Sequence, residues 1–188
     1  MDFIEGLPKS DGKEVILVVV DRLIKYVHFK ALAHPYIAIL VAKAFIDNVY
    51  KLHGLPATIV SDWDTVFLSQ FWKSLFVCQG VDLHYSIAYH PQSNGQIEVV
   101  NKCVESYLRC MRSDTSTQWS KWLPLYECWY NTNYHTLTKN TPYEVLYGLM
   151  PPIHIPCVLK DSANETVDKL LSNKEEMLKI TRNNLQAV

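Results

Sequence analysis

An unbroken run of apolar, mostly β-branched residues near the start of the chain constrains the fold more than any other feature. It lies within residues 14–23, EVILVVVDRL. A half-exposed strand would alternate polar and apolar residues, so this run predicts a strand that is buried on both faces, in the middle of a sheet. Residues 25–32, KYVHFKAL, follow after a connection too short for a parallel crossover. We therefore expect the two segments to pair as antiparallel strands.

Strand and helix patterns continue along the chain. Short strands are expected in MDFIEGL at the start, over 57–61 and over 82–88. Apolar residues recur at helical spacing in several other segments. The expected helices cover 37–52, 70–79, the residues from Gly95 onward, 118–135 and 141–148. This order of elements predicts an α/β fold with a mixed, five-stranded sheet flanked by helices.

Helix boundaries are marked by capping residues. Ser69 is the expected cap of the helix at 70–79, and Thr141 followed by Pro142 is the expected start of the helix at 141–148. Pro124 falls inside 118–135, so that helix is either kinked or begins later. Residues 162–165, SANE, match a capping box ahead of a polar helix.

Length and composition suit one globular domain with a tail. The chain has 188 residues, of which 48% are hydrophobic and 20% charged, and its apolar runs are too short for a membrane span. We expect a domain over 1–152 and, over 153–188, a linker with a polar helix, and no membrane partner. The net charge of -1 argues against a protein that coats DNA through phosphate neutralisation alone. Any contact with nucleic acid must be local, or helped by segments absent here.

The five cysteines are odd in number and include no C-x-x-C pair, and no histidine and cysteine cluster has the spacing of a zinc site. This pattern predicts reduced, intracellular cysteines that lie in the core.

Three carboxylates are the candidate catalytic residues. Asp2 lies in the first expected strand, Asp62 directly follows the strand at 57–61, and Glu98 lies near the start of the helix after the loop YHPQSNG. Convergent carboxylates from different elements are what two hard cations need for displacement at phosphorus, and such ligands suit Mg²⁺ or Mn²⁺. The alternative is that they are surface acids or helix caps, because acidic residues are favoured in the first turn of any helix.

Several motifs in order resemble the catalytic core of retroviral-type integrases, specifically those of gypsy-class LTR retrotransposons. The matching segments are MDFIEGLPKSDGKEVILVVVDRLIKYVHF, SDWDTVF, YHPQSNGQIEVVNKCVESYLR and WYNTNYHTLTKNTPYEVLYGLMPP. The family places thirty-five residues between its second aspartate and its glutamate, and here 98 − 62 − 1 = 35. The resemblance covers about residues 1–152. It implies a ribonuclease H-like fold in which Asp2, Asp62 and Glu98 bind two Mg²⁺ or Mn²⁺ ions.

The resemblance also implies an activity and partners. Such a core trims the end of an element's DNA and then joins the exposed 3′ hydroxyl to target DNA, acting as a multimer in the nucleus. The loop YHPQSNG looks like the family's mobile active-site loop, with Gly95 as its hinge. The expected contacts with DNA are Tyr89, Gln92, Asn94, Lys102 and Arg109. Their alternatives are ordinary ones, such as packing for Tyr89 and helix-surface charge for Lys102.

Departures from the family pattern leave two other functions open. Trp63 stands where the family usually has a basic residue, and we expect the chain to be a core truncated at its amino terminus and lacking the family's flanking domains. One alternative is a ribonuclease H-type nuclease that cuts RNA in hybrids. The other is a non-catalytic remnant that binds nucleic acid or protein. Metal binding would separate the remnant from the enzymes.

Overall fold

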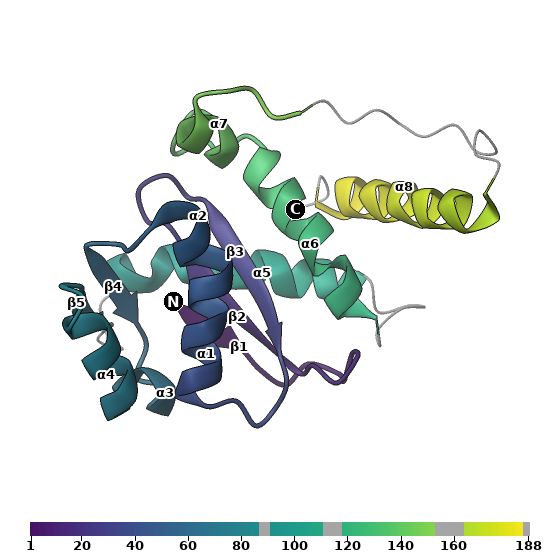
Figure 1. The fold of residues 1–188 in the computed structure, drawn as a ribbon. Helices are drawn as coiled ribbons and strands as arrows, with labels where there is room; N and C mark the ends of the chain where they lie inside the picture. Colours follow the sequence, from purple (N-terminus) through teal and green to yellow (C-terminus); the bar gives the residue numbers. More distant parts are fainter. Residues whose placement is uncertain (87–90, 111–117, 153–163, 186–188) are drawn as a thin grey trace.

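The three amino-terminal strands form the centre of the molecule. The computed structural model describes residues 1–86, 91–110, 118–152 and 164–185. Strands β1 (Asp2–Ile4), β2 (Val15–Val20) and β3 (Val27–Leu32) form an antiparallel sheet in the order β1-β2-β3 (Figure 1). The predicted antiparallel pairing of the second and third strands is confirmed.

Strand β2 is buried on both faces, as its apolar run predicts. Val15 and Leu17 belong to a core with helix α1 (Ala38–Phe45) and helix α4 (Gln70–Val77). Ile16 and Val18 point the other way, into a second core formed with helices α5 (Pro91–Cys110) and α6 (Trp119–Thr132). Successive side chains of a strand point to opposite faces, so a strand between two helical layers needs an apolar residue at every position. The three-stranded sheet is thus the middle layer of the fold.

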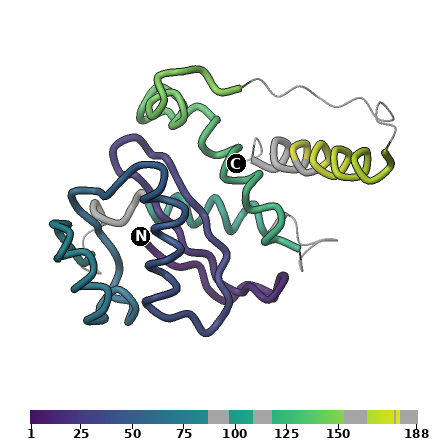
Figure 2. Tube along the Cα trace, viewed as in Figure 1, coloured from purple at the N-terminus to yellow at the C-terminus, as the bar shows by residue number. Residues whose placement is uncertain are grey.

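The expected single five-stranded sheet is not formed. Strands β4 (Thr58–Ser61) and β5 (Asp82–Tyr85) pair in parallel as a separate, two-stranded sheet. Next to β1, the Met1 amino group donates a hydrogen bond to the Val60 carbonyl oxygen of β4 at 2.6 Å. Figure 2 shows the amino terminus inside the molecule, between the two sheets.

The helices mostly follow the expected ranges, with two differences. The helix expected over 37–52 consists of α1, the π-helical turn η1 (Ile46–Tyr50) and α2 (Lys51–His53). Helix α5 begins at Pro91 and not near Gly95, so most of the expected loop is already helical. Proline suits a first helical turn because its missing N–H has no partner there. The strand expected over 82–88 ends at Tyr85, and residues 87 and 88 lie outside the described residues.

The expected caps are present. The Ser69 hydroxyl accepts a hydrogen bond from the Trp72 amide at the start of α4. Thr141 and Glu144 form a capping box on α7 (Pro142–Tyr147). Asp64 caps the short helix α3 (Thr65–Leu68).

The structure shows how the chain passes Pro124 and where the carboxyl-terminal helix begins. Helix α6 begins at Trp119 and runs through Pro124, so it does not begin later than the proline. Helix α8 (Glu165–Leu185) starts after Asn164, whose side chain accepts from the Thr166 amide, and the helix lies against α5 and α6. Ser162 of the expected capping box lies outside the described residues.

Aromatic residues of α6 pack into the core, whereas two of the three cysteines whose side chains are described do not. Trp119, Tyr126 and Tyr130 are buried in the core between α5, α6 and the sheet. Cys78 and Cys128 are exposed and Cys103 is half-buried, so the expectation of core cysteines is wrong for the first two. None of the described helices is long and apolar enough to cross a membrane.

Candidate active site

Two of the three predicted carboxylates come from neighbouring strands of different sheets. Asp2 is the first residue of β1 and pairs with Val18 of the central strand. Asp62 directly follows β4, and the hydrogen bond from Met1 to Val60 holds that strand beside β1. Asp2 and Asp62 are both half-buried and interact directly. The structure therefore brings together two residues that are 60 positions apart only because β1 and β4 lie side by side.

The carboxyl groups of Asp2 and Asp62 repel one another when both are ionised. Burial raises the pKa of Asp62 to about 6, and the negative charge of Asp2 adds to this shift. A hydrogen bond from the Asp64 amide to Asp62 Oδ1, at 3.3 Å, acts in the opposite direction but is long. Two carboxylates in one partly desolvated place disfavour each other's charged form. Such a pair attracts a cation.

The buried amino group of Met1 lies close to the same two carboxylates. Burial lowers the pKa of this amino group to about 6, while the charges of Asp2 and Asp62 oppose the shift. An ammonium group at this position would partly neutralise the pair.

Helix α5 contributes the third side of the site. The Asn101 side-chain amide donates to Asp2 Oδ2 at 2.7 Å, which ties this helix to β1. Glu98 lies three residues earlier, on the same face of α5, and its side chain is exposed. Because α5 begins at Pro91, Glu98 lies beyond the first turn, and the macrodipole does not explain an acidic residue there.

Glu98 does not join the two aspartates as a ligand set. Among the described residues, no three His, Cys, Asp or Glu side chains gather closely enough to hold a metal ion. The Asp2 and Asp62 pair nevertheless fits a divalent cation, because it offers hard oxygen donors and an excess of negative charge. Glu98 lies on the neighbouring helix α5 with an exposed side chain, outside any such group.

Of the five predicted DNA contacts, only Lys102 has a side chain within the described part of the structure. Lys102 is exposed on α5, one turn after Glu98. Gln92, Asn94 and Arg109 lie in the same helix, but their side chains are outside the described residues. Tyr89 lies outside the described residues altogether. These five assignments stay predictions.

Asn101 is the residue that sequence reasoning missed. It touches Asp2 directly, and its Oδ1 atom is buried without a hydrogen-bond partner in the described part of the chain. The available signal was its spacing, because a residue three positions after Glu98 shares its helix face. A polar residue on the helix face that carries Glu98 is a candidate to hold another side chain of the site in place.

Relatives among curated proteins are retrotransposon polyproteins. No family model matches the chain. It is 32% identical over 183 residues to the Transposon Tf2-3 polyprotein of Schizosaccharomyces pombe, and it matches the Tf2-4 polyprotein equally well. The match covers 94% of this chain but spans only 14% of the polyprotein.

Solved structures with the same fold are retroviral integrases. A chain of the simian T-cell lymphotropic virus intasome matches with a TM-score of 0.66 and 16% identity, over 87% of this chain and 59% of that one. The HTLV-2 integrase catalytic core, solved with magnesium in a trimeric form, matches with a TM-score of 0.59 and 17% identity, over 77% and 93%. The BIV integrase catalytic core matches with a TM-score of 0.56 and 20% identity, over 77% and 91%. These likenesses show a ribonuclease H-like fold.

Proposed function

Since the chain belongs with the integrase cores of LTR-retrotransposon polyproteins, we propose that it is a metal-dependent polynucleotidyl transferase for DNA integration. Its reactions are trimming of an element's 3′ ends and transfer of those ends to target DNA. The observation that carries the proposal is the half-buried pair of Asp2 and Asp62, in which burial and mutual repulsion raise the pKa of Asp62 to about 6. Perturbed carboxylates at the edge of a sheet are typical of catalytic sites.

Asp2, Asp62 and Glu98 are the proposed ligands of two Mg²⁺ or Mn²⁺ ions. Bound there, the ions supply activation of the attacking oxygen and stabilisation of the leaving oxygen. Asp2 is held by the Asn101 amide, and Asp62 by the Asp64 amide, so both carboxylates are oriented before any cation binds. Glu98 approaches from α5 and closes the ligand set. That approach is the conformational change that substrate binding has to stabilise.

The proposed substrates are the ends of the element's DNA and target DNA. On α5, Lys102 shares the face of Glu98 and offers a cation for a phosphate near the two aspartates. Tyr89, Gln92, Asn94 and Arg109 are the other proposed contacts. A homo-oligomer, working in the nucleus, is part of the proposal. The HTLV-2 core, which shares the fold, was solved in both trimeric and dimeric forms, which supports the proposed oligomer.

The first test is strand transfer and its reversal on a branched DNA substrate in Mn²⁺. We expect activity in the wild type and its loss in Glu98→Gln and Asp62→Asn. The matched control is Asp82→Asn, at an exposed position of β5, which should keep wild-type activity.

Three results would contradict the proposal. Equal activity in Glu98→Gln and the wild type would remove Glu98 from the site. Cleavage of RNA–DNA hybrids without any strand transfer would favour a ribonuclease H-type nuclease. Absence of both activities, with no calorimetric binding of Mg²⁺ or Mn²⁺, would identify a non-catalytic remnant.

A further inference from the structure

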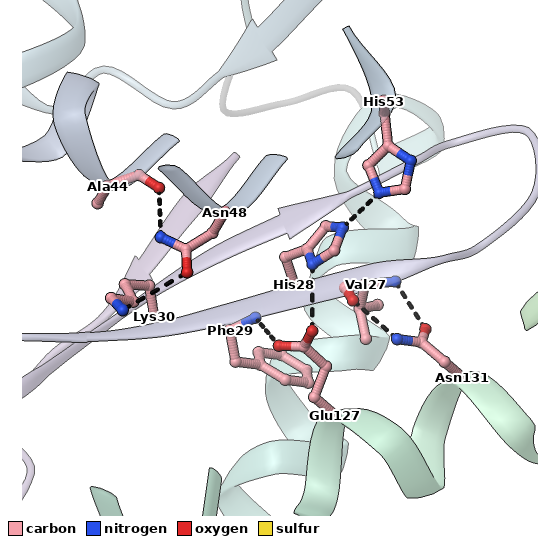
Figure 3. Close-up of polar contacts among 9 residues, drawn as sticks. All are labelled: Val27, His28, Phe29, Lys30, Ala44, Asn48, His53, Glu127 and Asn131. Atoms are coloured by element: carbon pink, nitrogen blue, oxygen red, sulfur yellow. Dashed lines mark hydrogen bonds and ion pairs between the residues drawn. The ribbon is translucent and has the colours of Figure 1, made fainter. Parts of the chain in front are cut away.

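A second polar cluster lies away from the carboxylates and joins three elements. His28 is on β3, His53 ends α2, and Glu127 is on α6 (Figure 3). The two Nε2 atoms of His28 and His53 are 2.9 Å apart, and His28 Nδ1 is 3.1 Å from Glu127 Oε1. His28 is buried, with 8% of its surface exposed, whereas His53 is exposed.

The contacts of His28 determine where its proton lies. An ionised carboxylate only accepts, so Nδ1 of His28 carries a hydrogen and donates it to Glu127. In neutral His28 the Nε2 atom is then an acceptor, and it receives the Nε2 hydrogen of His53. Both Nε2 atoms are therefore aimed at one point, and a single proton lies between them.

Both carboxylate oxygens of Glu127 are hydrogen-bonded, which fixes the side chain beside His28. Its other oxygen, Oε2, accepts a hydrogen bond from the Phe29 backbone amide at 2.8 Å. The carboxylate is thus fixed to the edge of β3, beside the residue that it orients. A carboxylate on the Nδ1–H of a histidine fixes the tautomer and makes Nε2 a stronger metal ligand.

The geometry of the two rings is close to that of a metal site. Two nitrogens bound to one tetrahedral Zn²⁺ are roughly 3.3 Å apart, given Zn–N bonds of about 2.0–2.1 Å. The observed separation is 2.9 Å, so the rings need to part only slightly. His53 is exposed and ends a three-residue helix, so its ring can shift without disturbing the core.

The cluster also opens onto a space that admits an ion. His28 and His53 line a cavity of about 550 Å³, in which most other lining residues are apolar and Asp21 and Arg22 are the charged ones. Water can enter it and fill the coordination positions that protein does not supply, which gives the ion an entry path.

We propose that His28 and His53 bind a transition-metal ion, with Zn²⁺ the expected ion, through their Nε2 atoms, and that Glu127 positions His28 for this. The ion replaces the hydrogen between the two Nε2 atoms, which leaves to solvent while the Nδ1 atom of the exposed His53 takes up a proton from solvent. Water or a small ligand from the cavity completes the coordination. Imidazole ligands select zinc-like ions, whereas the carboxylates of the candidate active site select Mg²⁺ or Mn²⁺. The two sites are therefore chemically distinct, and this proposal does not depend on the proposed DNA chemistry.

Titration of the full chain with Zn²⁺, in excess Mg²⁺ to occupy the carboxylates, tests the site by calorimetry. The wild type should bind one ion, His53→Ala should abolish this binding, and the control His84→Ala, at an exposed histidine of β5, should leave it unchanged. Absence of saturable binding in the wild type, or equal binding by His53→Ala, would overturn the proposal. Because His53 is exposed, its replacement should not prevent folding, and circular dichroism checks this.

Glu127→Gln tests whether the carboxylate positions the metal ligand. Its amide oxygen can still accept from the Phe29 amide, so the edge of β3 stays paired, but its NH2 group then takes the place of Oε1 and cannot accept from His28 Nδ1. Zn²⁺ affinity should fall by roughly 10–100-fold. Unchanged affinity would contradict the role of Glu127.

The absorption spectrum of the Co²⁺ form identifies the ligands. Visible bands without a sulfur charge-transfer band support two histidines. A sulfur band would show that the exposed Cys78 or Cys128 binds the metal instead, and would overturn the assignment.

Discussion

The two edges of the three-stranded sheet differ in how their polar side chains are paired. At the β3 edge, Asn131 of α6 accepts from the Val27 amide at 2.8 Å and donates to the Val27 carbonyl at 2.9 Å. Glu127 accepts from the next free amide of that strand, on Phe29. At the β1 edge, Asp2 lies close to Asp62, and burial together with the negative charge of Asp2 raises the pKa of Asp62. The polar groups of the first edge pair with one another, whereas at the second edge two carboxylates of the same charge lie together, although Asp2 also accepts from Asn101.

That difference separates a structural from a functional use of buried polar groups. An exposed strand edge invites pairing with other chains, and α6 covers the β3 edge with side chains that imitate a neighbouring strand. Full satisfaction makes this edge rigid. The carboxylate pair lowers stability, and a site that lowers stability in the absence of its ligand is typical of function.

The largest expected effect is at the satisfied edge. Asn131→Ala should lower the free energy of unfolding by about 2–4 kcal/mol, because Asn131 is only 2% exposed and its loss leaves two buried backbone groups of Val27 without partners. Urea denaturation measures this. The control is Asn173→Ala, at an exposed position of α8, and an equal effect of both changes would show that the edge contacts contribute nothing special.

At the unsatisfied edge, removing a charge should stabilise the protein. Asp62→Asn should raise the free energy of unfolding at pH 7.5 by roughly 1–2 kcal/mol, which is the pKa shift converted at about 1.4 kcal/mol per unit and reduced for solvent screening.

The same change should alter the pH dependence of stability in a defined direction. The pKa of Asp62 rises from 3.8 in the unfolded chain to about 6 in the folded one, so between these values the folded state holds the extra proton. Stability therefore falls as pH increases from 4 through 6, and Asp62→Asn should remove that part of the slope. Denaturation at several pH values compares the variant with the wild type. A lower stability of Asp62→Asn at pH 7.5 would contradict the assigned repulsion.

The smallest expected effect on stability is at Asn101. Asn101→Ala loses the hydrogen bond to Asp2, but it also removes a buried oxygen that has no partner in the described part of the chain. These contributions oppose each other, so the free energy of unfolding should change by less than about 1 kcal/mol. Calorimetry should nevertheless find several-fold weaker Mn²⁺ binding, because Asp2 is no longer oriented. A large loss of stability with unchanged Mn²⁺ affinity would make Asn101 a structural residue only.

Local sequence determined much of the secondary structure. The unbroken apolar run of β2 requires helices on both of its faces, and both are present. Ser69 and Thr141 mark helix starts because their hydroxyls reach an amide within three residues. Patterns of this kind depend on neighbours in the chain, so they survive any tertiary arrangement.

Tertiary structure decided what the sequence left open. The sequence patterns do not reveal the division of the five strands into a three-stranded and a two-stranded sheet, or the start of α5 at Pro91. Asp2 and Asp62 were recognisable as candidates from the sequence, but their mutual repulsion and the Asn101 contact required β1, β4 and α5 to meet.

The histidine cluster had no local signal at all. Its members come from three elements, 25 and 99 positions apart in the chain. The sequence by itself determined strands, helices and caps, because each of these depends on residues only three or four positions apart. Which distant polar groups face one another follows from packing of the layers, because side chains far apart in the chain meet only where the burial of apolar surface places them.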